Sequence, residues 1–128
     1  MADEITLTIP RQADFHRVAH LVLGGLAVRM NLTIENLEDL QIALDALLDR
    51  AEPDIGDITV RMALRDGALE AKVGPLPQAV LDEAEREQED GLGLRRVLET
   101  TVDDVHVDGD WIALTKNVSP PVSENGDG

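Results

Sequence analysis

The 128-residue sequence contains no cysteine, which excludes disulfides, thiolate metal sites and cysteine nucleophiles. Basic residues are scarce: 11 lysines and arginines compare with 26 aspartates and glutamates, so the net charge is −15. Such an acidic surface repels nucleic acid and anionic membranes, and we expect binding to neither. The sequence also lacks a basic, apolar leader and any apolar run of membrane-spanning length. These absences predict a cytoplasmic protein.

Serine is missing from all but the end of the sequence. The only two serines, Ser119 and Ser123, lie in a stretch rich in proline, glycine and acidic residues. This composition predicts a disordered acidic tail over 119–128. A serine–histidine–acid triad would therefore have no nucleophile in the folded part. Residues 1–118 are long enough for one domain with a sizeable core.

The most regular stretch of the sequence is 33–51. Its apolar residues recur at spacings of three and four, which is the period of an amphipathic helix. Thr33 is a suitable N-cap for this helix. No other segment is so strongly helical and so apolar on one side. We therefore expect the rest of the chain to pack around it.

The remaining patterns predict strands that come mostly in hairpins. Strands are predicted over 4–9, 58–64, 69–73, 104–107 and 111–116, with turns at Asp66-Gly67 and 108–110. Helices are predicted over 13–30 and from 91 to about 101, and the acidic segment 78–89 as a short exposed helix or a mobile loop. Trp111, the only tryptophan, is expected to pack in the core or at a sheet edge. This order predicts an α/β (α+β) two-layer sandwich, in which helices cover one face of a mixed, mostly antiparallel sheet.

Three pieces of the sequence together resemble the anti-sigma-factor serine kinase branch of the GHKL ATPases. The first is the N-terminal strand followed by Phe15-His16-Arg17-Val18. The second is the helix 33–51, which resembles the N-box helix of the family. The third is Asp90-Gly91-Leu92-Gly93-Leu94, which resembles the glycine-rich G2 box and precedes the last hairpin. The resemblance covers most of the chain and implies the histidine-kinase-like (Bergerat) fold, serine/threonine kinase activity and a magnesium–ATP cofactor.

The sequence departs from this family at the residues that perform catalysis. Active members carry a glutamate on the N-box helix and, four residues later, an asparagine that binds magnesium. These positions fall on Ala46 and Arg50, and neither side chain can bind magnesium, although Arg50 could pair with a phosphate. The family's adenine-binding aspartate falls near Gly74 or Pro75, whose side chains accept no hydrogen bond. The sequence therefore predicts no catalytic residue, and no cofactor is assigned to it.

One nucleotide-binding piece is retained. Glycines at a helix start let backbone amides approach a phosphate, and the helix dipole favours an anion there. If a nucleotide binds, the resemblance implies that its ligands are Gly91, Leu92, Gly93, Leu94 and Arg50. The same glycine pattern is also ordinary turn chemistry. In addition, the acidic run 82–90 stands in place of the family's longer ATP lid and would repel a polyphosphate.

The resemblance also implies a protein partner. In the family, an arginine at the position of Arg17, close to Phe15, contacts both the sigma factor and the anti-sigma antagonist. An arginine on a helix of an acidic chain suits a charge-paired contact, and the alternative is a surface arginine paired with Asp14. His16 and His20 have the spacing of a two-histidine metal site but no evident third ligand. We therefore predict no metal site and a histidine pair that faces solvent.

The leading hypothesis is a regulatory protein-binding module without kinase activity. It would bind a sigma factor or a partner-switching antagonist through the helix 13–30, around Arg17 and an apolar patch nearby. The rival hypothesis is an active ATP-dependent kinase with displaced ligands such as Asp45 or Asp49. Because these two carboxylates should lie on a different part of the helix surface from Ala46 and Arg50, solvated surface acids are the alternative for them. The third hypothesis is a scaffold that dimerises with an active relative, and family relatives also form homodimers.

Overall fold

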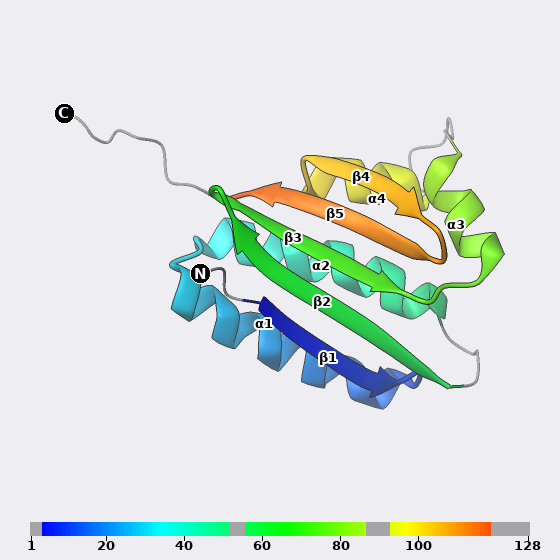
Figure 1. Ribbon diagram of the computed structural model, residues 1–128, viewed down its shortest axis with the longest axis horizontal. Coiled ribbons are helices and arrows are strands. Elements are labelled where there is room, and N and C mark those ends of the chain that lie inside the picture. Colours follow the sequence, from blue (N-terminus) through cyan, green and yellow to red (C-terminus); the bar gives the residue numbers. More distant parts are fainter. Residues whose placement is uncertain (1–3, 52–55, 87–92, 119–128) are drawn as a thin grey trace.

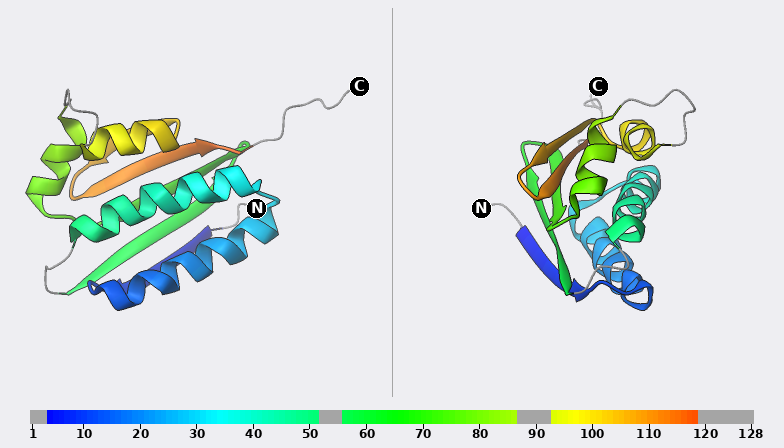
Figure 2. Two further views of the ribbon diagram at one scale, coloured as in Figure 1. Left: turned by 180° about the vertical axis from the view of Figure 1, so that it is seen from behind. Right: turned by 90° about the vertical axis from the view of Figure 1, so that its right-hand side faces the viewer.

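Five strands form one sheet, and helices cover one of its faces (Figures 1 and 2). The computed structural model describes residues 4–51, 56–86 and 93–118. The strand order is β1-β2-β3-β5-β4, and every neighbouring pair is antiparallel. The predicted two-layer sandwich is confirmed, but the described sheet is antiparallel throughout instead of mixed. The elements are β1 (Glu4–Pro10), a 3-10 turn (Ala13–Phe15), α1 (His16–Met30), α2 (Ile34–Ala51), β2 (Asp57–Arg65), β3 (Ala68–Gly74), α3 (Gln78–Glu85), α4 (Leu94–Thr101), β4 (Asp104–Asp108) and β5 (Trp111–Asn117).

The helix α2 is the centre of the helical layer. It runs between α1 and α4 over the sheet, and α3 lies at one end of the layer (Figure 2). Its N-terminus is capped as predicted, because the Asn36 N–H donates to Thr33 Oγ1 at 3.0 Å. Its core-facing residues are at most 4% exposed: Leu40, Ala43, Leu44, Leu47 and Leu48. They pack against the inner face of the sheet, whose buried residues include Ile58, Val60, Met62, Leu69, Val73, Ile112 and Leu114. Within the described residues, none of the helices has the length and apolar character that a membrane span needs.

The first hairpin has the turn that its sequence predicts. Asp66 and Gly67 join β2 to β3, and both adopt left-handed backbone angles, with φ of 53° and 78°. Two consecutive positive φ values are typical of the tight turn that matches the twist of antiparallel strands. This turn sets the register in which Val60 lies opposite Val73 and Met62 lies opposite Ala71.

The structure corrects the prediction for the acidic segment 78–89. Residues 78–85 form a short helix, α3, which is the first of the two predicted alternatives, but the helix is not exposed on all sides, because Val80, Leu81 and Ala84 are at most 6% exposed. These three residues share one face of the helix and pack near α4 and β4. The acidic composition of the segment concealed this apolar face. Residues 87–89 and the predicted tail 119–128 lie outside the described residues.

Gly74, at the end of β3, leaves room for the indole ring of Trp111. A Cβ at position 74 would lie 2.6 Å from Trp111 Cδ2 and 3.0 Å from the Asp110 carbonyl oxygen. Gly74→Ala is therefore expected to lower the free energy of unfolding by about 1–3 kcal/mol, because backbone and ring must move apart. Urea denaturation measures this change. The matched control is Gly25→Ala on α1, where an added Cβ meets nothing within 4 Å, and it should raise stability by about 0.5–1 kcal/mol. Equal effects in the two variants would contradict the predicted clash.

Candidate functional site

The helix α2 presents different residues to α1 and to α3. On the α1 side, Asp45 Oδ1 lies 2.5 Å from His20 Nε2, and Asp49 Oδ1 lies 3.4 Å from His16 Nδ1. The predicted solvent-facing histidine pair is therefore wrong: both histidines pair with acids of α2, and the His16 side chain is only 13% exposed. On α1 the two histidines are four residues apart, and on α2 the two aspartates are also four residues apart. Both ion pairs can therefore form between the neighbouring helices.

These pairs also bear on the idea of displaced metal ligands. Asp45 and Asp49 engage α1, whereas Arg50 on the same helix contacts α3. The two carboxylates thus lie on a different part of the α2 surface from Arg50, as expected from the sequence. Within the described residues, no three histidine, aspartate or glutamate side chains are close enough together to hold a metal ion.

Arg50 is held by groups of the protein. Its Nε donates to Glu83 Oε1 of α3 at 3.2 Å, and its Nη1 donates to the carbonyl oxygen of Ala46 at 3.0 Å. Ala46 belongs to the core and is 9% exposed. A partly buried arginine with two such partners is oriented toward α3 instead of toward open solvent.

The N-terminus of α4 binds the same carboxylate. Gly93 is the N-cap residue, and the backbone N–H of Leu94 donates to Glu83 Oε2 at 3.2 Å. A negative side chain at this place satisfies an N–H group that would otherwise lack a partner and interacts favourably with the helix dipole. Arg95 reinforces the contact between α3 and α4, because its Nη1 donates to the Ala84 carbonyl at 3.1 Å. The two carboxylate oxygens of Glu83 thus accept hydrogen bonds from Arg50 of α2 and from Leu94 of α4. Through these bonds Glu83 connects α2, α3 and α4 at one point.

The structure brings together three of the five residues predicted to bind nucleotide. Arg50, Gly93 and Leu94 meet around Glu83, whereas Gly91 and Leu92 lie outside the described residues. Sequence reasoning missed Glu83. It is one acid in an acidic run, and only the packing of α3 against α4 distinguishes it from its neighbours.

The residues just after β3 form hydrogen bonds through their backbone groups. The Leu76 N–H donates to the Asp110 carbonyl at 2.8 Å, and the Pro75 carbonyl accepts a hydrogen bond from Arg11 Nη2. Arg11 is buried, and among the described residues its Nε and Nη1 have no hydrogen-bond partner. The side chains of Gly74 and Pro75 offer no acceptor for an adenine amino group.

The outer surface of α1 exposes both charged and apolar residues. Arg17 is exposed and forms no ion pair within the described part of the chain, so the alternative pairing with Asp14 is not observed. Phe15 and Val18 are each 36% exposed, and Leu21 and Val28 are 76% and 80% exposed. Arg17, Leu21 and Val28 lie four and seven residues apart, which places them along one side of the helix.

Comparison with known proteins gives the family. No protein-family model matches the chain. Serine-protein kinase RsbW of Listeria monocytogenes serotype 4a is 30% identical to it over 149 residues, which cover 98% of this chain and 94% of that protein. The chain belongs to the RsbW family. RsbW of Bacillus mycoides is 27% identical over 147 residues, with 96% of this chain and 90% of that protein covered.

A solved structure agrees with this assignment at the level of the fold. The crystal structure of the RsbU and RsbW domains of Rv1364c from Mycobacterium tuberculosis matches 93% of this chain with a TM-score of 0.69 and 18% identity. The chain spans only 33% of that longer protein.

Proposed function

We propose that this RsbW-family protein is a regulatory module that binds a sigma factor or a partner-switching antagonist without transferring phosphate from ATP. The contacts of the Glu83 carboxylate support the loss of kinase activity most directly. The two described groups best suited to hold a phosphate, the Arg50 guanidinium and the Leu94 N–H, both bind Glu83. A polyphosphate would have to displace Glu83 and give up both hydrogen bonds, and would then repel the carboxylate it had displaced.

The surroundings of α2 give a second, independent support. Magnesium requires oxygen ligands in near-octahedral geometry, and the position of the family's glutamate is occupied by the core residue Ala46. Asp45 and Asp49, the candidates for displaced ligands, are paired with His20 and His16 of α1. A magnesium ion beside Arg50 would therefore meet a cation and an alanine in place of two ligands.

The partner-binding part of the proposal rests on the outer surface of α1. Exposed apolar side chains that adjoin a charged residue are typical of protein interfaces, in which arginine often contributes much of the binding energy. Leu21 and Val28 are exposed to 76% and 80%, and Arg17 lies one turn before Leu21. From the family resemblance we propose a sigma factor or its antagonist as the partner, and Arg17 and Phe15 as residues of the contact.

Self-association is the second candidate use of the same surface. Leu21 and Val28 are seven residues apart, the repeat by which two helices pack along a shared apolar seam. Such a dimer, with a second copy or with an active relative, would make the protein a scaffold. Sedimentation of the purified protein across a range of concentrations distinguishes a monomer from a dimer.

Thermal melts with and without magnesium–ATP test the proposed loss of nucleotide binding. A protein saturated at 100 times its dissociation constant gains about 2.7 kcal/mol, which raises its melting temperature by several degrees. We expect no shift for this protein and a clear shift for the listerial RsbW as the positive control. A comparable shift in both proteins would contradict the proposal.

Gel filtration tests the proposed partner binding. The protein is expected to co-elute with a sigma factor or antagonist of the same organism. Failure of every such protein to co-elute would overturn this part of the proposal.

A further inference from the structure

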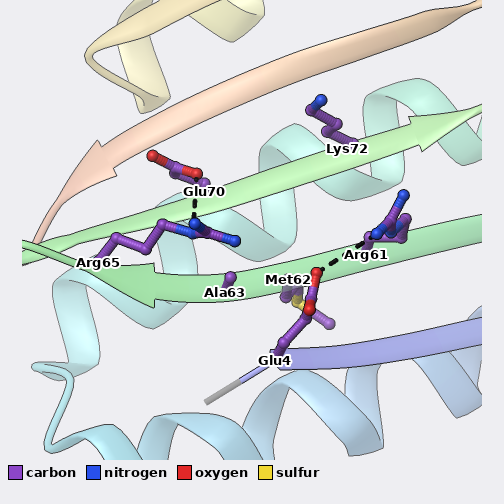
Figure 3. Close-up of a pocket in the computed structure, with 7 residues that line it drawn as sticks. All are labelled: Glu4, Arg61, Met62, Ala63, Arg65, Glu70 and Lys72. Atoms are coloured by element: carbon purple, nitrogen blue, oxygen red, sulfur yellow. Dashed lines mark hydrogen bonds and ion pairs between the residues drawn. The ribbon is translucent and has the colours of Figure 1, made fainter. Parts of the chain in front are cut away.

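The face of the sheet opposite the helices carries a hollow of about 270 Å³ (Figure 3). Ala63 of β2 forms part of its floor and is only 5% exposed. Its cross-strand neighbours on this face are Glu4 of β1 and Glu70 of β3. Arg61 and Arg65 flank Ala63 along β2, and Lys72 follows Glu70 on β3. The small side chain of Ala63 thus lies among five long, charged ones.

The basic residues of this hollow are unusual for so acidic a chain. Three of the 11 lysines and arginines, Arg61, Arg65 and Lys72, line this one hollow. Arg61 and Lys72 are directly opposite each other on neighbouring strands. Like charges in that position destabilise a sheet. In a sequence with 26 acidic residues, an acid opposite Arg61 or Lys72 would have avoided this cost. The juxtaposition of Arg61 and Lys72 is easier to explain by a ligand than by stability.

The cations of the hollow have weak internal partners. Arg61 Nη2 lies 3.4 Å from Glu4 Oε2, Arg65 Nε lies 3.5 Å from Glu70 Oε1, and Lys72 Nζ lies 3.5 Å from Asp108 Oδ2. The three basic side chains are about half exposed, at 51%, 52% and 47%. Long ion pairs in solvent contribute little stability. A guanidinium also has five N–H donors, so each arginine can bind a further carboxylate.

We propose that this hollow binds an acidic, extended polypeptide segment of a partner protein. Arg61 and Arg65 are four residues apart on one strand, which separates their Cα atoms by about 13 Å. Cations distributed along two strands match carboxylates distributed along a peptide, whereas a phosphate requires donors that converge on one point. The hollow and α1 lie on opposite sides of the sheet (Figures 1 and 3). Both surfaces can therefore be occupied at once, and this site is independent of the function proposed above.

A labelled peptide of alternating glutamate and threonine, long enough to span β2, tests the proposal by fluorescence anisotropy at low salt. The full-length protein should bind it, and a peptide with glutamine in place of glutamate should bind at least about tenfold more weakly. The double variant Arg61→Glu/Lys72→Glu should reduce the affinity on the order of tenfold or more. Arg61→Gln/Lys72→Gln should reduce it less and is the milder variant if charge reversal impairs folding.

The matched control is Arg86→Glu/Arg96→Glu, which changes the net charge equally at two exposed residues away from the sheet. It should bind the peptide as the unmodified protein does. The proposal is wrong if this control loses as much affinity as the double variant, or if neither variant of Arg61 and Lys72 weakens binding. It is also overturned if inorganic phosphate releases the peptide and sodium chloride of equal ionic strength does not, since the hollow would then be a site for compact anions.

Discussion

Leu47→Ala is expected to lower the free energy of unfolding by about 2–5 kcal/mol. Leu47 is fully buried in the C-terminal half of α2, the helix that contacts α1, α3 and α4. The substitution removes apolar side-chain atoms from the core and leaves a cavity that the rigid surroundings fill only in part. Because a domain of this kind has a total stability of about 5–15 kcal/mol, the variant should unfold at a much lower urea concentration.

An exposed residue of the same helix provides the control for this prediction. Ile42 is also apolar and lies five residues before Leu47, but it is 50% exposed. Ile42→Ala should therefore change the free energy of unfolding by less than about 1 kcal/mol. The slope of the urea transition should stay the same in both variants. If the two substitutions had equal costs, α2 would not be the centre of the core.

Most of the fold could be predicted because its signals are local. The alternation of apolar and polar residues in β2 and β3, together with Asp66-Gly67, determines a hairpin without reference to the rest of the chain. The hydroxyl of Thr33 caps the helix that begins at Ile34, as its sequence indicates. The helix α1 begins at His16, one turn later than the predicted start at residue 13, since residues 13–15 form a 3-10 turn before the helix.

The candidate site was less predictable because its contacts are tertiary. Arg50 was found through its place in the family pattern, but its partner Glu83 is 33 residues away in the sequence. The pairing of His20 with Asp45 depends on how α1 lies against α2, which the helical period of either segment alone does not determine. The composition of α3 was similarly misleading, because three buried residues decide its position among many acidic ones.

Arg17→Glu is expected to weaken binding of the sigma factor or antagonist by about 30-fold or more, which corresponds to about 2 kcal/mol. Arg17 is exposed on α1 and has no ion pair within the described residues. Its replacement therefore breaks no ion pair inside the described fold, and the melting temperature should change little. In the proposed interface, the reversed charge would instead repel the acidic group of the partner that pairs with Arg17. Isothermal titration with the purified partner measures the change in affinity.

Two further substitutions separate the interface from a general effect of charge. Arg96→Glu on α4 makes the net charge more negative by the same amount at another exposed position, and should leave the affinity within about twofold of the original. Arg17→Lys keeps the charge but loses the planar pair of donors, so it should restore only part of the affinity. If Arg17→Glu bound the partner as tightly as the original protein, the contact would lie elsewhere than α1. Full binding by Arg17→Lys would mean that charge alone recognises the partner, without a paired hydrogen bond from the guanidinium.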